Sequence, residues 1–208
     1  MSRLRKPSGT WRRWAIVAAV FSLFVAACGA SSPAVLTGMV REPAPDVGGV
    51  VLPYEANGGR DFTTRAEPGR LLLVYFGYTS CPDVCPTTLA DLRTAVQGLG
   101  DEGERVDVAI ITVDPDRDVP ERVTNYLHAF FDDGHALRTG DPAQLAAAAD
   151  RYGAAYEVTT TADGSVEVAH SAFLYVVDSA GRILVQWPFG TLSEDMKNDL
   201  AYLFAEGV

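Results

Sequence analysis

Residues 71–86 read LLLVYFGYTSCPDVCP, and this stretch decides the fold. Its first part, residues 71–78, is a continuous apolar run after a Pro-Gly break, which is typical of a strand buried on both faces. Two cysteines follow at once, and residues 87–96 then space their leucines and valine as a helix does. The stretch therefore predicts a buried strand, a cysteine-bearing turn and a helix in direct succession.

The remainder of the chain alternates between strand and helix patterns. Residues 106–113, VDVAIITV, predict a second buried strand, and a closing helix is expected over 195–204. The other predicted elements are helices at 120–131 and 142–152, a short strand around Leu137, and hairpins at 50–64, 155–169 and 172–187. This order predicts one α/β domain with the thioredoxin-like fold, a central mixed sheet flanked by helices, with an N-terminal hairpin.

Cys81 and Cys85 are separated by three residues at the start of the predicted helix, so both can face one side of its first turn. Unpaired N–H groups and the partial positive charge at a helix N-terminus favour the thiolate and lower a cysteine pKa. A thiolate pair can cycle between dithiol and disulfide, or it can hold a soft metal such as Cu(I). An inert structural pair is the alternative, but proline and aspartate around a strand-to-helix turn favour an exposed site.

Two sulfur ligands alone do not complete a metal site. Structural zinc usually takes four protein ligands, whereas Cu(I) accepts fewer, so one more ligand would suffice for copper. The candidates are the three histidines His128, His135 and His170. His128 falls in a predicted helix and His135 in a loop, while His170 precedes a strand that would run beside the cysteine turn in a thioredoxin-like fold. The residues by themselves leave the third ligand open.

The first 28 residues differ from the rest of the chain. A basic segment precedes residues 14–27, which are apolar except for Ser22. This run is shorter than the roughly 20 residues that a membrane span needs, and it suits the core of a signal peptide. It ends in Val25-Ala26-Ala27-Cys28, which resembles a bacterial lipobox. We therefore predict a signal peptide over 1–28 that ends at the lipidated Cys28, with a short membrane anchor as the alternative.

Lipidation at Cys28 would place the mature protein on the extracytoplasmic face of the cell membrane, where disulfides are permitted. A flexible tether is expected over 29–47, because this segment is small, polar and proline-containing, and the folded domain is expected over 48–208. With Cys28 lipidated, an intramolecular disulfide can join only Cys81 and Cys85.

The chain is acidic, with 27 Asp and Glu against 17 Lys and Arg and a formal net charge of −10. Removing the five basic residues of the predicted signal peptide leaves 12 Lys and Arg against 27 Asp and Glu, a formal charge of −15. Nucleic-acid binding depends on basic side chains that neutralise phosphates, so we expect no nucleic-acid partner.

Three segments carry a family resemblance: FGYTSCPDVCP at 76–86, VDPDRD at 113–118 and AHSAFLYVVDSAGRI at 169–183. Together they closely resemble the Sco (SenC/PrrC) family, and the resemblance covers the chain from about Val50 to its C-terminus. It implies a thioredoxin-fold, membrane-tethered copper protein that helps to assemble the binuclear copper centre of cytochrome c oxidase. It further implies that Cu(I) or Cu(II) is bound by Cys81, Cys85 and His170.

The resemblance also implies an acidic loop near the site, which Asp114 and Asp116 match. Asp-Pro-Asp is equally ordinary turn chemistry, and Asp118 is expected to cap the helix that follows, so none of the three is counted as a ligand. Many family members have Thr at the position of Val119 and an acidic residue at that of Ala169. Neither departure removes a ligand, but both change the polar groups around the site.

The resemblance implies a metallochaperone rather than an enzyme. Its partners would be the copper-bearing subunit of cytochrome c oxidase, other copper chaperones or thiol reductants, and the membrane through a lipid anchor. The alternative is a thiol–disulfide reductase that keeps oxidase cysteines reduced, which needs Cys81 and Cys85 but not His170. A peroxidase ranks lower, because peroxiredoxins resemble one another in a Thr three residues before the reactive Cys, where this chain has Tyr78.

Overall fold

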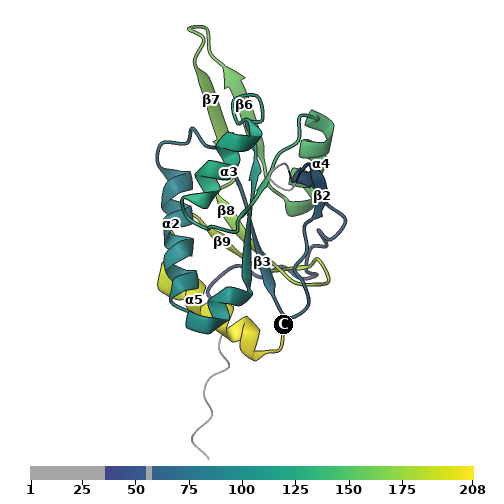
Figure 1. Cartoon of the computed structure of the whole chain (residues 1–208), viewed down its shortest axis with the longest axis vertical. Helices are drawn as coiled ribbons and strands as arrows, with labels where there is room; N and C mark the ends of the chain where they lie inside the picture. The colour runs from purple at the N-terminus through teal and green to yellow at the C-terminus, as the bar shows by residue number, and fades with distance from the viewer. Residues whose placement is uncertain (1–35, 55–57) are drawn as a thin grey trace, which may run out of the picture. The chain divides into compact units, whose positions relative to one another are not determined.

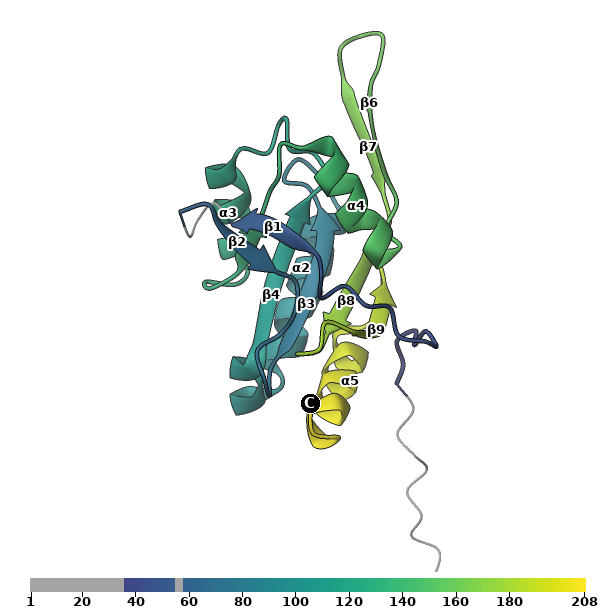
Figure 2. The same ribbon diagram turned by 90° about the vertical axis from the view of Figure 1, so that its right-hand side faces the viewer.

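The computed structural model describes residues 36–54 and 58–208. Within these ranges seven strands form one mixed sheet in the order β2-β1-β5-β4-β3-β8-β9, and β6 and β7 form a separate ribbon (Figures 1 and 2). The sheet strands are β1 (Val51–Tyr54), β2 (Arg60–Thr63), β3 (Leu71–Gly77), β4 (Val106–Thr112), β5 (His135–Leu137), β8 (Phe173–Val177) and β9 (Ile183–Pro188). The ribbon strands are β6 (Tyr156–Thr160) and β7 (Val166–His170).

Helices cover both faces of the sheet. Helices α2 (Val84–Gln97) and α5 (Ser193–Ala205) lie side by side on one face, and α4 (Pro142–Tyr152) lies on the other (Figures 1 and 2). Helix α3 (Pro120–His128) packs against β5, and a 3₁₀ helix (Gly100–Arg105) leads into β4. The predicted central mixed sheet flanked by helices is confirmed, and the expected N-terminal hairpin, β1–β2, forms one edge of this sheet.

Strand β3 is the centre of the core. All seven of its residues are buried, as its continuous apolar run predicts. It pairs in parallel with β4 and antiparallel with β8, so both of its edges are hydrogen-bonded. The parallel pairing places the ends of β3 and β4 at the same edge of the sheet, and the antiparallel pairing places the start of β8 there too.

Local sequence signals set the ends of helix α4. Asp141 caps it, because its carboxylate accepts a hydrogen bond from the Ala143 N–H at 2.9 Å, as its position before Pro142 suggests. Gly153 ends the helix with a φ of 68°, a left-handed conformation that glycine adopts without a steric penalty. Each signal adjoins the end of the helix that it sets, so the sequence alone could locate it.

The folded body begins earlier than residue 48, where the sequence analysis placed it. The N–H groups of Thr37 and Gly38 donate to the carboxylate of Asp199 at 2.8 and 2.9 Å. Met39 then forms an antiparallel backbone bridge with Gln186 of β9. Val47, further along the segment, is fully buried. The segment 37–47 is therefore part of the domain, because backbone hydrogen bonds to distant residues compensate for its weak local pattern. The earlier part of the expected tether lies outside the described residues.

The predicted signal peptide and the lipidation site at Cys28 also lie outside the described residues. Across the part of the chain that the structure describes, no helix has both the length and the apolarity to cross a membrane.

Asp199 should be a main stabiliser of the N-terminal segment. Its carboxylate is 3% exposed and accepts the N–H groups of Thr37 and Gly38 and the indole N–H of Trp187. We expect Asp199→Ala to lower the free energy of unfolding by about 3 kcal/mol, since it leaves three donors without their charged acceptor. Urea unfolding measures this, with the exposed Glu206→Ala as the control. Equal losses in the two variants would contradict the assignment.

Candidate metal centre

The cysteine turn begins directly where β3 ends. The Cys81 N–H bonds back to the Tyr78 carbonyl at 3.4 Å, which closes the turn, and helix α2 starts three residues later. Asp83 stands at the N-cap, but its side chain makes no capping hydrogen bond. Instead the Cys85 N–H donates to the sulfur of Cys81 at 3.3 Å. The Cys81 sulfur thus takes the place of the usual capping oxygen, and the free N–H groups of the helix stabilise negative charge on it.

Asp118 holds this turn against the end of β4. Its fully buried carboxylate accepts the Thr79 N–H at 3.0 Å, the Thr79 hydroxyl, and the Thr112 hydroxyl at 2.6 Å. The expectation that Asp118 caps α3 is wrong, because the N-cap is Val119 and no side chain caps that helix. The carboxylate is used instead to fix the residue two positions before Cys81. Nothing in the local pattern distinguishes this role from a cap.

His170 ends β7 and reaches the cysteines from the other side. Its Nδ1 lies 3.1 Å from the Ser171 carbonyl, so Nδ1 carries the proton that is donated to that oxygen. The other ring nitrogen, Nε2, is then free to offer a lone pair, and it lies 3.6 Å from the sulfur of Cys85. The ring meets Tyr75 and Tyr78 edge-on, with centroid distances of 6.0 and 5.8 Å, which limits its rotation.

Cys81, Cys85 and His170 form a single cluster, and their ligand atoms lie within 4.8 Å of one another. The other two histidines are elsewhere among the described residues: His128 bonds to the Gly134 carbonyl, and His135 packs against Phe62. Among the three histidines left open by the sequence, tertiary structure therefore brings only His170 to the cysteines. That these three side chains bind a metal stays a prediction.

The donor set suits a soft metal of low coordination number. A metal about 2.0–2.3 Å from each donor atom would hold three ligands roughly 3.5–4 Å apart, and the observed spacing needs only small side-chain rotations to reach that. The hydroxyl of Tyr75 is buried beside this cluster without a hydrogen-bond partner, so it can donate to a charged sulfur. Two thiolates and one imidazole fit Cu(I), while zinc would need a fourth ligand.

The two cysteines have opposite environments. Cys81 is half-buried, and its pKa is lowered because hydrogen bonds from the N–H groups of Cys85 and Asp83 outweigh the effect of burial. Cys85 is fully buried, and this burial raises its pKa to about 12. Burial also lowers the pKa of His170, so its imidazole is neutral at neutral pH. Cys81, the less buried of the two, is thus the more reactive, and Cys85 gives up its proton only to a metal or in a disulfide.

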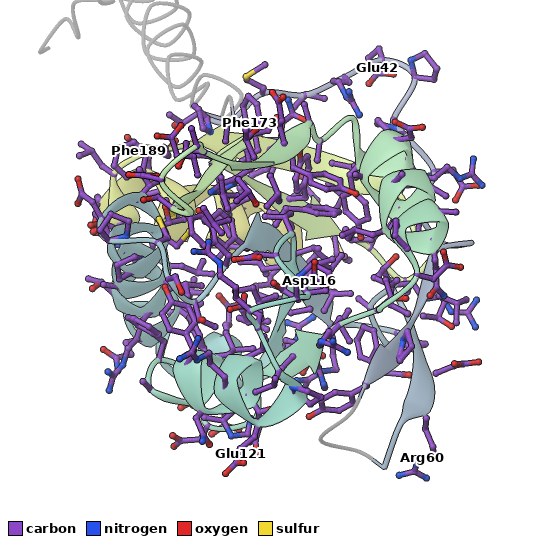
Figure 3. The ribbon with its side chains drawn as sticks, turned by 90° about the horizontal axis from the view of Figure 1, so that it is seen from above. Glu42, Arg60, Asp116, Glu121, Phe173 and Phe189 are labelled. Atoms are coloured by element: carbon purple, nitrogen blue, oxygen red, sulfur yellow. The ribbon has the colours of Figure 1, made fainter. Side chains whose placement is uncertain are left out.

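The centre opens to solvent at one end of the domain. A shallow cavity of about 400 Å³ is lined by His170 and by its neighbours at the base of the β6–β7 ribbon. Figure 3 views the domain from this end, with Phe173 and Phe189 on one side, Glu121 on the other and Asp116 between them. Asp114, the other acidic residue expected near the site, is buried and paired with Arg117. Neither aspartate is part of the Cys–Cys–His cluster.

Comparisons with known proteins agree with this geometry. The SCO1/SenC family model matches residues 52–205. A putative copper-binding protein of Stutzerimonas stutzeri is 34% identical over 123 residues, which cover 59% of this chain and 60% of that protein, less than two thirds of its length. Bradyrhizobium japonicum ScoI, solved with copper bound, is 33% identical with a TM-score of 0.61, covering 74% of this chain and 98% of that one. Arabidopsis thaliana ScoI, also solved with copper bound, is 26% identical with a TM-score of 0.67, covering 78% and 99%.

The fold and the site define a thioredoxin-like domain with a Cys–Cys–His group at one edge of its sheet, and the predicted fold class is confirmed. The chain belongs to the SCO1/SenC family, whose model matches most of its length.

Alkylation should separate the two cysteines. We expect iodoacetamide to modify Cys81 well before Cys85, because Cys81 has the lowered pKa and is the less buried of the two. The Cys81 rate should rise with pH and level off below the ordinary cysteine pKa of about 8.5, since a lower pKa gives more thiolate at each pH. Peptide mass spectrometry measures both sites, and the urea-unfolded chain, in which they should react alike, is the control. Equal rates in the folded chain would contradict the asymmetry.

Proposed function

We propose that this protein binds copper through Cys81, Cys85 and His170 and delivers it to the binuclear copper centre of cytochrome c oxidase. The observation that carries the proposal is the convergence of these three donors in a domain whose solved relatives hold copper. The sequence resemblance to the Sco family supports the oxidase as the recipient. In this role copper is a cargo, and the protein needs to hold it firmly and still release it.

The ligand environments suit such a cargo site. The neutral imidazole of His170 offers Nε2 without first losing a proton, because Nδ1 is bonded to the Ser171 carbonyl. Cys85 must release its proton when the metal binds, so copper uptake is coupled to proton release. Cys81 and His170 are only partly buried. Ligands of a recipient protein can therefore replace them one at a time at the surface.

A second function, thiol–disulfide exchange, is favoured by the difference between the two sulfurs. Exchange requires one accessible sulfur with thiolate character and a resolving sulfur close to it. Cys81 meets the first requirement, and Cys85 lies in the next turn with its N–H on the Cys81 sulfur. We propose that the pair also forms a reversible disulfide, and that its reduction precedes copper loading.

We also propose that lipidated Cys28 anchors the protein to the extracytoplasmic face of the cell membrane. The support is the basic segment, the short apolar run and the Val25-Ala26-Ala27-Cys28 sequence. Oxidase copper is inserted at that membrane, so an anchor would raise the local concentration of the domain without adding a contact.

Copper binding should depend on all three donors. We expect one copper per chain, and replacement of either cysteine by Ser should abolish tight binding. His170→Ala should weaken binding by at least about 100-fold, since even residues that only support a ligand typically contribute 10–100-fold. Competition titration of Cu(I) against a chelator measures the affinity, and His128→Ala is the matched histidine control. Wild-type affinity in Cys81→Ser/Cys85→Ser would place the site elsewhere.

Copper and the disulfide should exclude each other. A disulfide holds the sulfurs about 2 Å apart and removes both thiolates, so the oxidised protein should take up little Cu(I) until it is reduced. His170→Ala should lose copper affinity yet still form and exchange the disulfide, which separates the two functions. Cu(I) uptake is measured before and after reduction of the same sample. The proposal fails if oxidised and reduced protein load equally.

Processing at Cys28 should be visible at the mature N-terminus. We expect mass spectrometry of the membrane fraction to find a chain that begins with a lipidated Cys28. Cys28→Ala should lose the lipid and leave the copper affinity of the domain unchanged, because the described site is far along the chain from this residue. A chain that still begins at Met1, or an unmodified Cys28, would refute lipoprotein processing and favour a simple membrane anchor.

A further inference from the structure

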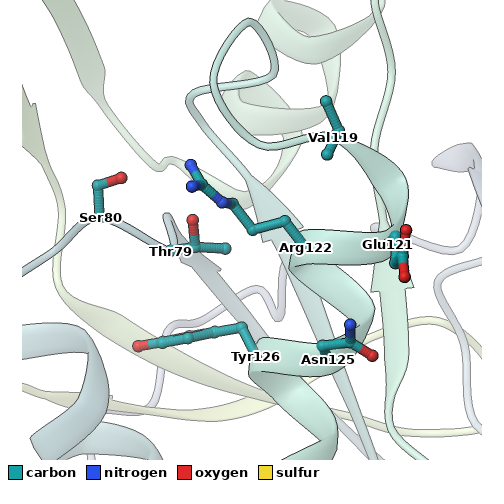
Figure 4. Close-up of a pocket in the computed structure, with 7 residues that line it drawn as sticks. All are labelled: Thr79, Ser80, Val119, Glu121, Arg122, Asn125 and Tyr126. Atoms are coloured by element: carbon teal, nitrogen blue, oxygen red, sulfur yellow. The ribbon is translucent and has the colours of Figure 1, made fainter.

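An open pocket lies beside the turn that carries Cys81. Its volume is about 610 Å³, within the range of small-molecule sites, which is roughly 300–1,000 Å³. One wall is formed by Thr79 and Ser80, and the other by side chains of the first turns of α3 (Figure 4). None of these residues belongs to the Cys–Cys–His cluster. Ser80 nevertheless directly precedes Cys81, so a ligand in this pocket would lie next to the reactive sulfur.

Arg122 gives the pocket an available positive charge. Its guanidinium makes one hydrogen bond, from Nη1 to the Arg117 carbonyl at 3.3 Å, and no carboxylate pairs with it among the described residues. Arg117, by contrast, is neutralised by Asp114. The Arg122 side chain points toward Thr79 and Ser80, whereas Glu121, the acidic residue of the lining, lies on the far side of the helix (Figure 4).

Other hydrogen-bond donors converge on the same space. The hydroxyl of Tyr126 is buried without a partner, and its ring points to the same side as Arg122 (Figure 4). The hydroxyl of Ser80 also lines the pocket, whereas Asn125 lies on the same side of α3 as Glu121 and points away from Arg122 (Figure 4). Helix α3 begins here with no side-chain cap, because Val119 stands at its N-cap. A guanidinium with several free N–H groups, two neutral donors and a helix N-terminus together favour a bound carboxylate.

The size and charge of the protein favour a small ligand over an acidic protein. The chain has a formal net charge of −10, so a large acidic surface would be repelled as a whole. A small molecule with one carboxylate responds mainly to Arg122, because charges more than about 8–10 Å away are screened at physiological ionic strength. Its position beside Cys81 gives such a molecule a reaction partner if it also carries a thiol.

We infer that this pocket binds the carboxylate of a small thiol that reduces the disulfide between Cys81 and Cys85. The inference rests on the disulfide exchange proposed above. In the first step the thiolate of the small molecule attacks the accessible Cys81 sulfur, the Cys81–Cys85 bond breaks, and Cys85 leaves and takes up a proton. In the second step another thiolate attacks the small-molecule sulfur of the mixed disulfide. The products are Cys81 thiolate and the oxidised small molecule, so two thiols reduce one disulfide.

The test compares two thiols on the oxidised full-length protein in non-ionic detergent. The probes are 3-mercaptopropionate, which carries a carboxylate, and 2-mercaptoethanol, which does not. Rates of disulfide reduction are followed by acid quenching, alkylation and mass spectrometry, and each rate is divided by the thiolate fraction of the probe. The ratio of the two rates within one variant cancels any general effect on folding or exchange. Arg122→Gln removes the charge, and the exposed Arg93→Gln on α2 is the matched control.

We expect the wild type and Arg93→Gln to prefer 3-mercaptopropionate by about tenfold, the effect of one charged hydrogen-bonded contact of about 1.4 kcal/mol. Arg122→Gln should remove this preference, and Tyr126→Phe should reduce it. A disulfide that forms but is reduced without carboxylate preference, or with a preference that Arg122→Gln leaves intact, overturns the pocket assignment alone. If oxidation yields no Cys81–Cys85 disulfide, the proposed exchange function fails, and this inference fails with it.

Discussion

Strand β3 is hydrogen-bonded on both edges, in parallel to β4 and antiparallel to β8, and the Cys–Cys–His cluster depends on this double pairing. Because β3 and β4 run in the same direction, the cysteine turn and the loop that carries Asp118 leave the sheet at one edge. Because β8 runs in the opposite direction, the chain enters it at that same edge, just after His170. Both halves of the Cys–Cys–His cluster are therefore placed by strand direction, and side-chain contacts only refine their positions.

Two sets of hydrogen bonds perform this refinement, and neither involves a cluster sulfur or Nε2. The buried carboxylate of Asp118 links Thr79 to Thr112, so the cysteine turn cannot move away from β4 without losing bonds to a buried charge. On the other side, the Ser171 carbonyl holds Nδ1 of His170 and directs Nε2 toward Cys85. Such support keeps three donors close together before any metal is present, which reduces the entropy lost on binding.

The unequal burial of Cys81 and Cys85 explains how one site could serve two kinds of chemistry. Burial raises the pKa of Cys85 to about 12, so this thiol reacts slowly with oxidants and alkylating agents in solution. A metal that binds the sulfur can still displace its proton. The N-terminus of α2 lowers the pKa of Cys81 and leaves it partly exposed. The adjoining pocket adds an unpaired Arg122 on the exposed side. Reactivity and ligand access are therefore both concentrated at Cys81.

The sequence by itself determined the strand–turn–helix that carries the cysteines, because periodicity and the spacing of Cys81 and Cys85 involve only neighbouring residues. It also indicated the mixed α/β architecture and, through family resemblance, His170. Only the tertiary structure decided, on geometric grounds, which of the three histidines lies beside the cysteines. It also decided that Asp118 supports the cysteine turn and that residues 37–47 pack onto the domain. Cys85 and His170 are 85 positions apart. Their contact follows from the pairing of β3 with β8, a long-range interaction that leaves no local pattern in the chain.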